Sequence, residues 1–379
     1  MVNNDRLLAT FIELVQIDSE TGNEEKIQPI LKRKFEQFNL HVEEDDAGKY
    51  DYLGANNLIC TLPSSEGYEN SDKIYFTSHM DTVAPGIGIK PNVADDGYIY
   101  SDGTTVLGAD DKAGLAAILE TIQVINEQNL PHGQVQFVIT VGEESGLEGA
   151  KVLNASLLDA DYGYAVDASS PVGTTVIGAP TQMKLSATIY GKKAHASTPD
   201  MGVSAINIAA KAISEMSLGR IDDETTANIG RFEGGSATNV VADEVTLQAE
   251  ARSHSEDKIN QQVAHMKQVF ESKAESFGCT ASVTIKESYK GFKVNAESKV
   301  AKIAALSASQ LNLDPQTKVG GGGSDASIIN TYGIPSVILG VGYENIHSKN
   351  ERMEIKSLQL LTQQLLKIVE LTHSHSKTV

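Results

Sequence analysis

Apolar residues recur along the chain in two spacings, one typical of helices and the other typical of buried strands. Residues 4–18, 24–38 and 112–128 carry apolar side chains three and four positions apart, which is the spacing of one helix face. Short apolar runs bounded by turn residues predict strands, and they span residues 57–62, 73–78, 134–141, 162–166 and 335–340. This alternation of helices and strands predicts an α/β domain built on a mostly parallel sheet.

Between residues 182 and 289 the pattern changes to long strands and two long helices. The strand-like stretches are 183–190, 226–232, 244–251 and 281–289, and the helix-like stretches are 204–216 and 256–277. Their order, β-α-β-β-α-β, is typical of a ferredoxin-like α+β domain. Helical spacing then returns in residues 298–311 and 357–372. We therefore expect residues 1–180 and 296–379 to form one domain, with residues 181–295 inserted into it and residues 373–379 frayed.

Composition and charge narrow the possible partners. The chain has 379 residues and a formal net charge of −19, from 31 Lys and Arg against 50 Asp and Glu. Such an acidic protein is a poor partner for nucleic acid or an anionic membrane. The N-terminal residues lack the pattern of a signal peptide, and no apolar run reaches the length of a membrane span. The two cysteines lie far apart and fit a reducing compartment, so we expect a cytoplasmic protein.

Residues that can bind a metal follow several of the predicted strands at their carboxyl ends. They are His79, Glu143, Glu144, Asp167 and His347. In open α/β sheets, ligands bind outside the carboxyl ends of the strands. A single histidine or carboxylate after a strand is more often an ordinary loop residue, and paired glutamates are more often solvated. Because such residues follow several strands at the same sheet edge, we nevertheless predict that they form one shared metal site.

The adjacent carboxylates Asp110 and Asp111 lie in a glycine-bounded turn at a predicted helix start. One aspartate there is a common helix cap, but a second carboxylate suggests a cation. Asp110 together with the residues that follow strands offers two imidazoles and three carboxylates, a set that suits zinc, manganese or cobalt. Five ligands exceed one open tetrahedral site, so we expect two divalent ions per chain with one shared carboxylate.

Two further carboxylates and a glycine loop fit around such a metal centre. Asp81 lies two residues after His79 and can accept the second N–H of that imidazole. Glu143 is adjacent to the predicted ligand Glu144 and can take a proton from a water nucleophile. The four glycines at residues 320–323 are either a flexible linker or a loop that approaches ligand closely.

These motifs resemble those of the M20 family of dinuclear zinc peptidases, in particular its tripeptide aminopeptidase (peptidase T) branch. The resemblance rests on residues 78–83 (SHMDTV), 108–114 (GADDKAG) and 142–146 (GEESG) and on Asp167, and it spans nearly the whole chain. It implies that Asp110 bridges two metals and is joined to Asp111 by a cis peptide bond. His79 and Asp167 then complete one metal site, and Glu144 and His347 complete the other. The same resemblance gives Asp81 the role of orienting His79 and Glu143 that of general base.

The resemblance also gives roles to the inserted domain, which in the family is a lid and dimerisation domain. It implies a homodimer and a histidine, His195, that polarises the scissile carbonyl from its own chain or from the partner chain. The candidates for binding the substrate carboxylate are Asn239, Arg252 and the backbone amides of Gly322 and Gly323. For Arg252, a surface salt bridge is the ordinary alternative.

The function that these residues favour is a metal-dependent exopeptidase acting on short peptides, of the tripeptide aminopeptidase kind. An N-acyl amino acid amidohydrolase or a carboxypeptidase would use the same metal motifs. A metallophosphoesterase and a catalytically inactive metal- or peptide-binding protein are the alternatives from other classes. Asp110 lies 31 positions after His79, fewer than in the peptidase T branch, so peptide length stays open.

Overall fold

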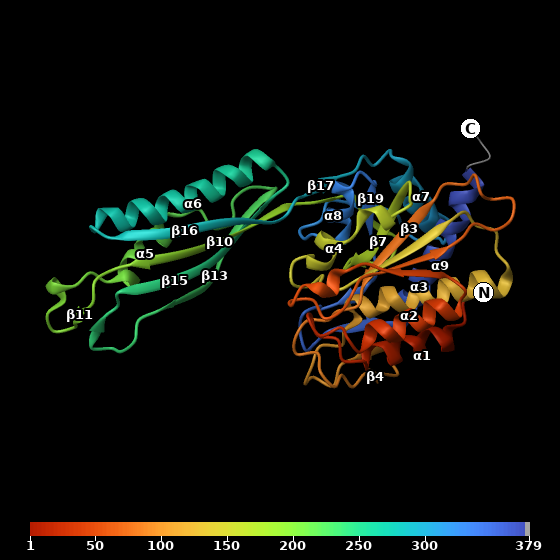
Figure 1. Cartoon of the computed structure of the whole chain (residues 1–379), viewed down its shortest axis with the longest axis horizontal. Coiled ribbons are helices and arrows are strands. Elements are labelled where there is room, and N and C mark those ends of the chain that lie inside the picture. The colour runs from red at the N-terminus through yellow and green to blue at the C-terminus, as the bar shows by residue number, and fades with distance from the viewer. Residues whose placement is uncertain (376–379) are drawn as a thin grey trace. The chain divides into compact units, whose positions relative to one another are not determined.

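A computed structural model describes the backbone of residues 1–375 and the side chains of residues 1–373 (Figure 1). The chain divides into two compact units. The first unit comprises Met1–Gly178, Lys293–Gly320 and Ser324–Val379, and the second comprises Ala179–Phe292 with Gly321–Gly323. Among the described residues, no helix is long and apolar enough to cross a membrane.

The first unit is built on an eight-stranded sheet of order β1-β2-β6-β3-β7-β19-β8-β18. The strands are β1 (His41–Glu44), β2 (Leu58–Leu62), β3 (Ile74–His79), β6 (Val135–Thr140), β7 (Tyr162–Ala168), β8 (Thr174–Val176), β18 (Gln316–Lys318) and β19 (Ser336–Gly340). The four central strands, β6, β3, β7 and β19, run parallel to one another. Their carboxyl ends therefore meet at one edge, as the apolar runs predicted, while β1 and β2 pair antiparallel.

Helices cover both faces of this sheet because its central strands are apolar on both sides. They are α1 (Asn4–Val15), α2 (Ile27–Gln37), α3 (Ala109–Gln128), α4 (Glu148–Val152), α7 (Lys299–Gln310), α8 (Asp325–Thr331) and α9 (Ile355–His375). Tyr75 packs with Ile329 of α8, whereas its neighbour Phe76 stacks on Phe137, which stacks on Phe35 of α2. Successive strand residues point to opposite faces, so α8 and α2 lie on opposite sides of the sheet.

A small second sheet joins two segments that are distant in sequence. Its strands, in the order β20-β21-β5-β4, are β20 (Tyr343–Glu344), β21 (Arg352–Glu354), β5 (Tyr98–Tyr100) and β4 (Asn92–Val93). Strands β5 and β21 pair antiparallel, which ties the segment between His79 and Asp110 to the segment that carries His347. Strands of two or three residues are too short to show an alternating pattern, and the sequence did not predict them.

The second unit is a five-stranded antiparallel sheet of order β12-β13-β15-β10-β16 with two helices on one face (Figure 1). Its elements are β10 (Thr181–Tyr190), α5 (Ala205–Glu215), β12 (Gly219–Arg220), β13 (Thr225–Gly234), β15 (Glu244–Ser253), α6 (Glu256–Ser276) and β16 (Thr280–Tyr289). Ile208 of α5 and Phe270 of α6 are buried against Ile189 and Leu247 of the sheet. The predicted β-α-β-β-α-β order is confirmed, with short strands added.

The remaining elements are short. They are β9 (Gly178–Ala179) paired with β17 (Phe292–Lys293), β11 (Ala194–His195) paired with β14 (Val240–Val241), and the 3-10 turns Ala47–Lys49, Ala155–Leu157 and Pro199–Met201.

Some predicted element ends were wrong. The first helix stops at Val15, the second starts only at Ile27, and α9 continues through His375. Fraying was therefore wrongly predicted for residues 373–375, because His373 is buried and its ring packs edge-on against Tyr68 at 5.0 Å. Residues 376–379, for which fraying was also predicted, lie outside the described residues.

Candidate active site

The fold brings the predicted metal ligands of the first unit to one edge of the parallel sheet. His79 is the last residue of β3, Asp167 lies near the end of β7, and Glu144 follows β6. Asp110 lies in the first turn of α3, and His347 lies between β20 and β21. Because β6, β3 and β7 are adjacent and parallel, their ends place these side chains close together.

The carboxylate of Asp110 lies between two imidazoles. Its Oδ1 is 3.1 Å from Nε2 of His79, and its Oδ2 is 3.2 Å from Nε2 of His347. Nε2 of His79 is also 3.7 Å from Oδ1 of Asp167, and Nε2 of His347 is 2.9 Å from Oε1 of Glu144. One carboxylate with an oxygen toward each histidine is the arrangement that a bridging metal ligand needs.

This donor set fits divalent metal ions. His79, Asp110 and Glu144 offer ligand atoms that all lie within 4.8 Å of one another, and so do His79, Asp111 and Asp167. The carboxylate of Asp111 already accepts hydrogen bonds from the Ser78 hydroxyl and from the backbone N–H of Gly114. Asp110 is therefore the better candidate for the bridging ligand, since its two oxygens face the two histidines.

The protonation of the cluster has a clear electrostatic cause. Burial raises the pKa of Glu144 to about 7, while hydrogen bonds to Asp110 and Glu144 raise the pKa of His347 to about 10. Buried carboxylates that surround a histidine favour its protonated form. A divalent cation supplies the same positive charge, so metal binding and loss of the His347 proton are coupled.

The predicted cis peptide bond between Asp110 and Asp111 is confirmed. The chain around it is held by Glu351, whose buried carboxylate accepts three backbone N–H groups. The donors are Leu107 at 2.7 Å, Gly108 at 2.8 Å and Asp110 at 3.0 Å. Glu351 lies four residues after His347, so it connects the chain on either side of the cluster. This role of Glu351 was not predicted, because nothing in the local sequence pattern shows a contact 241 positions away.

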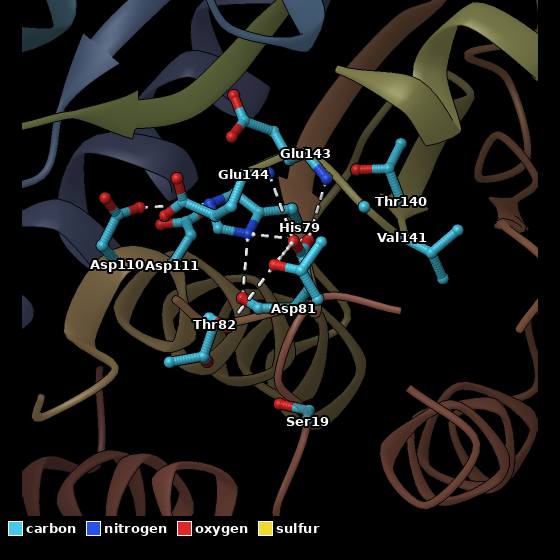
Figure 2. Close-up of polar contacts among 12 residues, drawn as sticks. Ser19, His79, Asp81, Thr82, Asp110, Asp111, Thr140, Val141, Glu143 and Glu144 are labelled. Atoms are coloured by element: carbon cyan, nitrogen blue, oxygen red, sulfur yellow. Dashed lines mark hydrogen bonds and ion pairs between the residues drawn. The ribbon is translucent and has the colours of Figure 1, made fainter. Parts of the chain in front are cut away.

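Asp81 contacts both His79 and the loop after β6 (Figure 2). Nδ1 of His79 is 3.0 Å from the backbone oxygen of Asp81 and 3.3 Å from its Oδ1. These oxygens favour a proton on Nδ1 and leave Nε2 free for a metal. The same carboxylate accepts the backbone N–H of Glu143 at 3.0 Å and of Glu144 at 3.2 Å, and the hydroxyl of Thr21 at 2.9 Å. The contacts with the backbone of Glu143 and Glu144 were not predicted.

Glu143 carries a buried carboxylate beside the cluster. The residue is 8 % exposed, and among the described side chains none donates a hydrogen bond to its carboxylate. Burial raises the pKa of Glu143 well above its usual range, and the negative charge of Asp167 adds to this effect. A carboxylate with a raised pKa is suited to accept a proton and release it again near neutral pH.

Two other buried ionisable residues near the cluster, Lys112 and Asp325, were not predicted. Lys112 donates hydrogen bonds from Nζ to Ser19 at 2.9 Å and to Thr82 at 2.6 Å, and burial lowers its pKa to about 8. Asp325 accepts the Thr140 hydroxyl through Oδ2, and its Oδ1 has no hydrogen-bond partner among the described residues. The signals that could have found them are the position of Lys112 directly after Asp111 and that of Asp325 two residues after Gly323.

In the second unit, His195 and Asn239 lie together although 44 positions separate them. His195 in β11 pairs with Val240 in β14, and the N–H of Ala196 donates to the oxygen of Asn239 at 2.9 Å. The exposed imidazole of His195 accepts the N–H of Ser197 at Nδ1, at 3.2 Å. An acceptor at Nδ1 places the proton of the neutral ring on Nε2, where it is free to be donated.

Arg252 forms a salt bridge with Glu250, the expected alternative to substrate binding, and it also contacts the glycine loop. Its Nε donates to Oε1 of Glu250 at 2.8 Å, and its Nη1 donates to the backbone oxygen of Gly321 at 3.2 Å. The N–H of Gly323 donates to the hydroxyl of Tyr289 at 3.0 Å, so this predicted substrate donor already has a partner. Gly322 lies close to the guanidinium, since a Cβ there would be 3.7 Å from Nη1.

Two histidines and three carboxylates at the carboxyl edge of a parallel sheet, beside a buried glutamate, define a metal-dependent hydrolase of the α/β class. The sequence model of the peptidase family M20/M25/M40 matches residues 75–371. The chain therefore belongs to this family, and it is a hydrolase of the metallopeptidase class.

Similar proteins of known name agree with this assignment. A tripeptidase from Staphylococcus aureus is 66 % identical, covers 99 % of this chain and 100 % of its own, and superposes with a TM-score of 0.96. Aminopeptidase PepT from Bacillus cereus is 52 % identical over 97 % of this chain and 98 % of its own, with a TM-score of 0.88. Peptidase T of Escherichia coli (strain SE11) is 25 % identical over 97 % of this chain and 98 % of its own. The predicted resemblance to M20 peptidases of the peptidase T kind is confirmed.

Proposed function

We propose that the protein is an aminopeptidase that removes the N-terminal residue from short peptides, chiefly tripeptides. The observation that supports this most is the Asp110 carboxylate between two imidazoles, with the buried Glu143 beside them. A chain that is 66 % identical over its full length is named a tripeptidase, and one that is 52 % identical is named an aminopeptidase.

The metal centre is proposed to hold two divalent ions per chain, zinc in the first place, with manganese or cobalt as alternatives. His79, Asp110 and Asp167 would hold one ion, and Asp110, Glu144 and His347 would hold the other. Nitrogen and oxygen donors without thiolate suit all three metals. When bound, such ions polarise a carbonyl oxygen and lower the pKa of water toward neutrality.

Glu143 is proposed to move the proton in the reaction. Its carboxylate takes a proton from the attacking water and delivers it to the nitrogen of the leaving amine. The raised pKa that burial gives Glu143 suits both halves of this transfer. Asp81 supports the step by holding the backbone N–H of Glu143 while it orients His79.

The second unit is proposed to bind the substrate and to form the homodimer. His195 donates its Nε2–H to the scissile carbonyl, which its contact with Ser197 at Nδ1 favours. Asn239, Arg252, Gly322 and Gly323 are the candidates for the substrate carboxylate, and Gly323 must first release the Tyr289 hydroxyl. A cytoplasmic enzyme that acts on short peptides, and on neither nucleic acid nor membranes, fits the net charge of −19.

A panel of di-, tri- and tetrapeptides tests the proposal. Each peptide is supplied with a free N-terminus, with an acetylated N-terminus or with an amidated C-terminus, and products are followed by mass spectrometry after loading with zinc or manganese. We expect loss of the first residue from tripeptides with both termini free, and no reaction after chelation with EDTA. The Glu143→Ala variant provides the matched inactive control.

Other outcomes assign the alternatives. Cleavage confined to N-acetylated substrates would make the protein an N-acyl amino acid amidohydrolase, and release of the last residue would make it a carboxypeptidase. Binding without cleavage of any member, with both metals bound, would make it a metal- or peptide-binding protein.

A further inference from the structure

Four consecutive backbone N–H groups at the end of β6 donate to side chains instead of to backbone carbonyls. Val141 donates to Oδ1 of Asn57 at 3.0 Å, and Gly142 donates to Oε1 of Glu24 at 3.0 Å. Glu143 and Glu144 donate to the two oxygens of Asp81. The loop that carries the general base is therefore positioned by side chains from three separate parts of the first unit.

Among the acceptor side chains, Asn57 and Glu24 have no other assigned role, and Glu24 is the one that carries a carboxylate. It is 0 % exposed, and its carboxylate accepts backbone N–H groups from three loops. Oε1 accepts Gly22 at 3.1 Å and Gly142 at 3.0 Å, while Oε2 accepts Gly54 at 2.8 Å. A carboxylate that accepts several N–H groups makes stronger, better directed bonds than a neutral acceptor. At Gly54 a Cβ would lie 2.4 Å from Oε2 of Glu24, so this close contact requires glycine.

The bond from Gly142 lies directly before Glu143. Gly142 has a φ of 59°, and a Cβ there would lie 2.4 Å from Cδ2 of Leu53. The chain thus turns sharply at this residue, and the direction of the Gly142 N–H fixes the turn that leads to Glu143. Displacing a reacting group by about 1 Å can lower a rate about a hundredfold.

We propose that Glu24 is a positioning residue for Glu143, which sets the place of the base through the Gly142 N–H without contacting metal or substrate. The inference rests on the proposed function, because it assumes that Glu143 transfers the proton. If Glu24 only stabilised the fold, its removal would not lower kcat in a way that depends on Glu143. A positioning role predicts that it does.

The first test is the variant Glu24→Gln, which keeps the shape but turns one acceptor oxygen into an N–H donor. Its neighbour Glu25 is exposed, so Glu25→Gln is the matched control. Tripeptide hydrolysis gives kcat and KM, and plasma mass spectrometry gives the metal content. We expect Glu24→Gln to lower kcat about tenfold or more with KM and both metals retained, and Glu25→Gln to match wild type.

The deciding test is a double-mutant cycle with Glu143→Ala. Two residues that act through one another do not have additive effects. Once the base is removed, adding Glu24→Gln should therefore cause no further loss of the residual kcat. If Glu24→Gln does not fold, Glu24→Asp replaces it in the same double-mutant cycle. This variant keeps the negative charge on a side chain that is shorter by one methylene group.

The contrary outcomes are distinct. An additive loss in the double variant, or loss of metal from Glu24→Gln, would overturn the inference and leave the proposed function intact. Full activity of the Glu143→Ala single variant would instead overturn the proposed function, and the inference with it.

Discussion

At the scale of single residues, the site depends on side chains that serve two neighbours at once. Asp110 offers one oxygen to His79 and the other to His347. Asp81 contacts His79 and also accepts the backbone N–H groups of Glu143 and Glu144. Since each carboxylate is shared, changing one of them should disturb two parts of the site together.

Glu143 and Glu144 are adjacent, but substituting them should have different effects on metal content and on kcat. Glu143→Ala removes the proposed base and no ligand, so both metals should remain while kcat falls by several orders of magnitude. Glu144→Ala removes a proposed ligand of the ion that His347 is also proposed to bind, so metal should be lost. Metal analysis and kcat for both variants check this, and the opposite pattern would exchange the two roles.

Asp81→Asn places an amide NH₂ group where the N–H groups of Glu143 and Glu144 now donate. At least one of these bonds must break, and His79 loses the nearby negative charge. We expect metal affinity to fall about 10- to 100-fold, as is usual when a partner of a metal-binding histidine is changed, and kcat to fall as well. Competition with a chelating indicator measures the affinity, and Asp5→Asn on the exposed face of α1 is the control. Wild-type values for both quantities would contradict the role.

The sequence could predict which histidines and carboxylates gather in one cluster, but not which side chains hold the loops around it. His79 and Asp167 follow apolar runs directly, and such positions are readable from the pattern. Glu24, by contrast, looked like an acid in the first turn of a helix. The structure starts α2 only at Ile27 and buries Glu24 against the N–H of Gly142, 118 positions away. No local pattern records a bond over that distance.

At the scale of elements, prediction succeeded where an apolar run was long enough to show its period. The central strands β3, β6 and β7 were predicted to within two residues at each end. Strands β4, β5, β20 and β21 were missed, because elements of two or three residues gain their stability from pairing with each other. Fold class was therefore predictable, whereas the sheet that connects the segments around Asp110 and His347 was not.

The segment between α3 and β6 gives a test of pH dependence. His132 is 6 % exposed, and burial lowers its pKa, an effect that the nearby His373 reinforces and a hydrogen bond to Gly133 opposes. A histidine whose pKa is lower in the folded state stabilises the fold above its unfolded pKa of about 6.5. That contribution is lost as the pH falls through the folded pKa.

We therefore expect His132→Gln to destabilise the protein at pH 8 by about 1–2 kcal/mol, the usual effect of disturbing a buried hydrogen bond. Because the wild type loses its advantage on acidification, the difference between the two proteins should shrink at pH 5. Urea unfolding at both pH values measures it, and the exposed His41→Gln serves as control. A difference that grows at low pH would contradict the sign of the shift.

At the scale of the whole molecule, His195 and Arg252 lie far apart within the second unit. Arg252 pairs with Gln182 at one end of the sheet, and Glu244 pairs with Tyr190 at the other. Arg252 lies eight positions after Glu244 along β15, which separates the two ends by roughly 27 Å. Strand β11 with His195 lies beyond the Tyr190 end (Figure 1). A tripeptide spans about 10 Å when extended. One substrate can thus contact both His195 and Arg252 only if they come from different chains.

This separation motivates the prediction that His195 acts in the partner's site of a homodimer with twofold symmetry. Chains carrying His195→Ala and Glu143→Ala, with different affinity tags, are co-expressed and the mixed dimer is purified. Each homodimer should be nearly inactive. In the mixed dimer, the His195→Ala chain keeps its own Glu143 and receives an intact His195 from its partner, so one of two sites is complete and about half the wild-type kcat should return. An inactive mixed dimer would mean that the histidine serves its own chain, and a fully active His195→Ala homodimer would remove it from the mechanism.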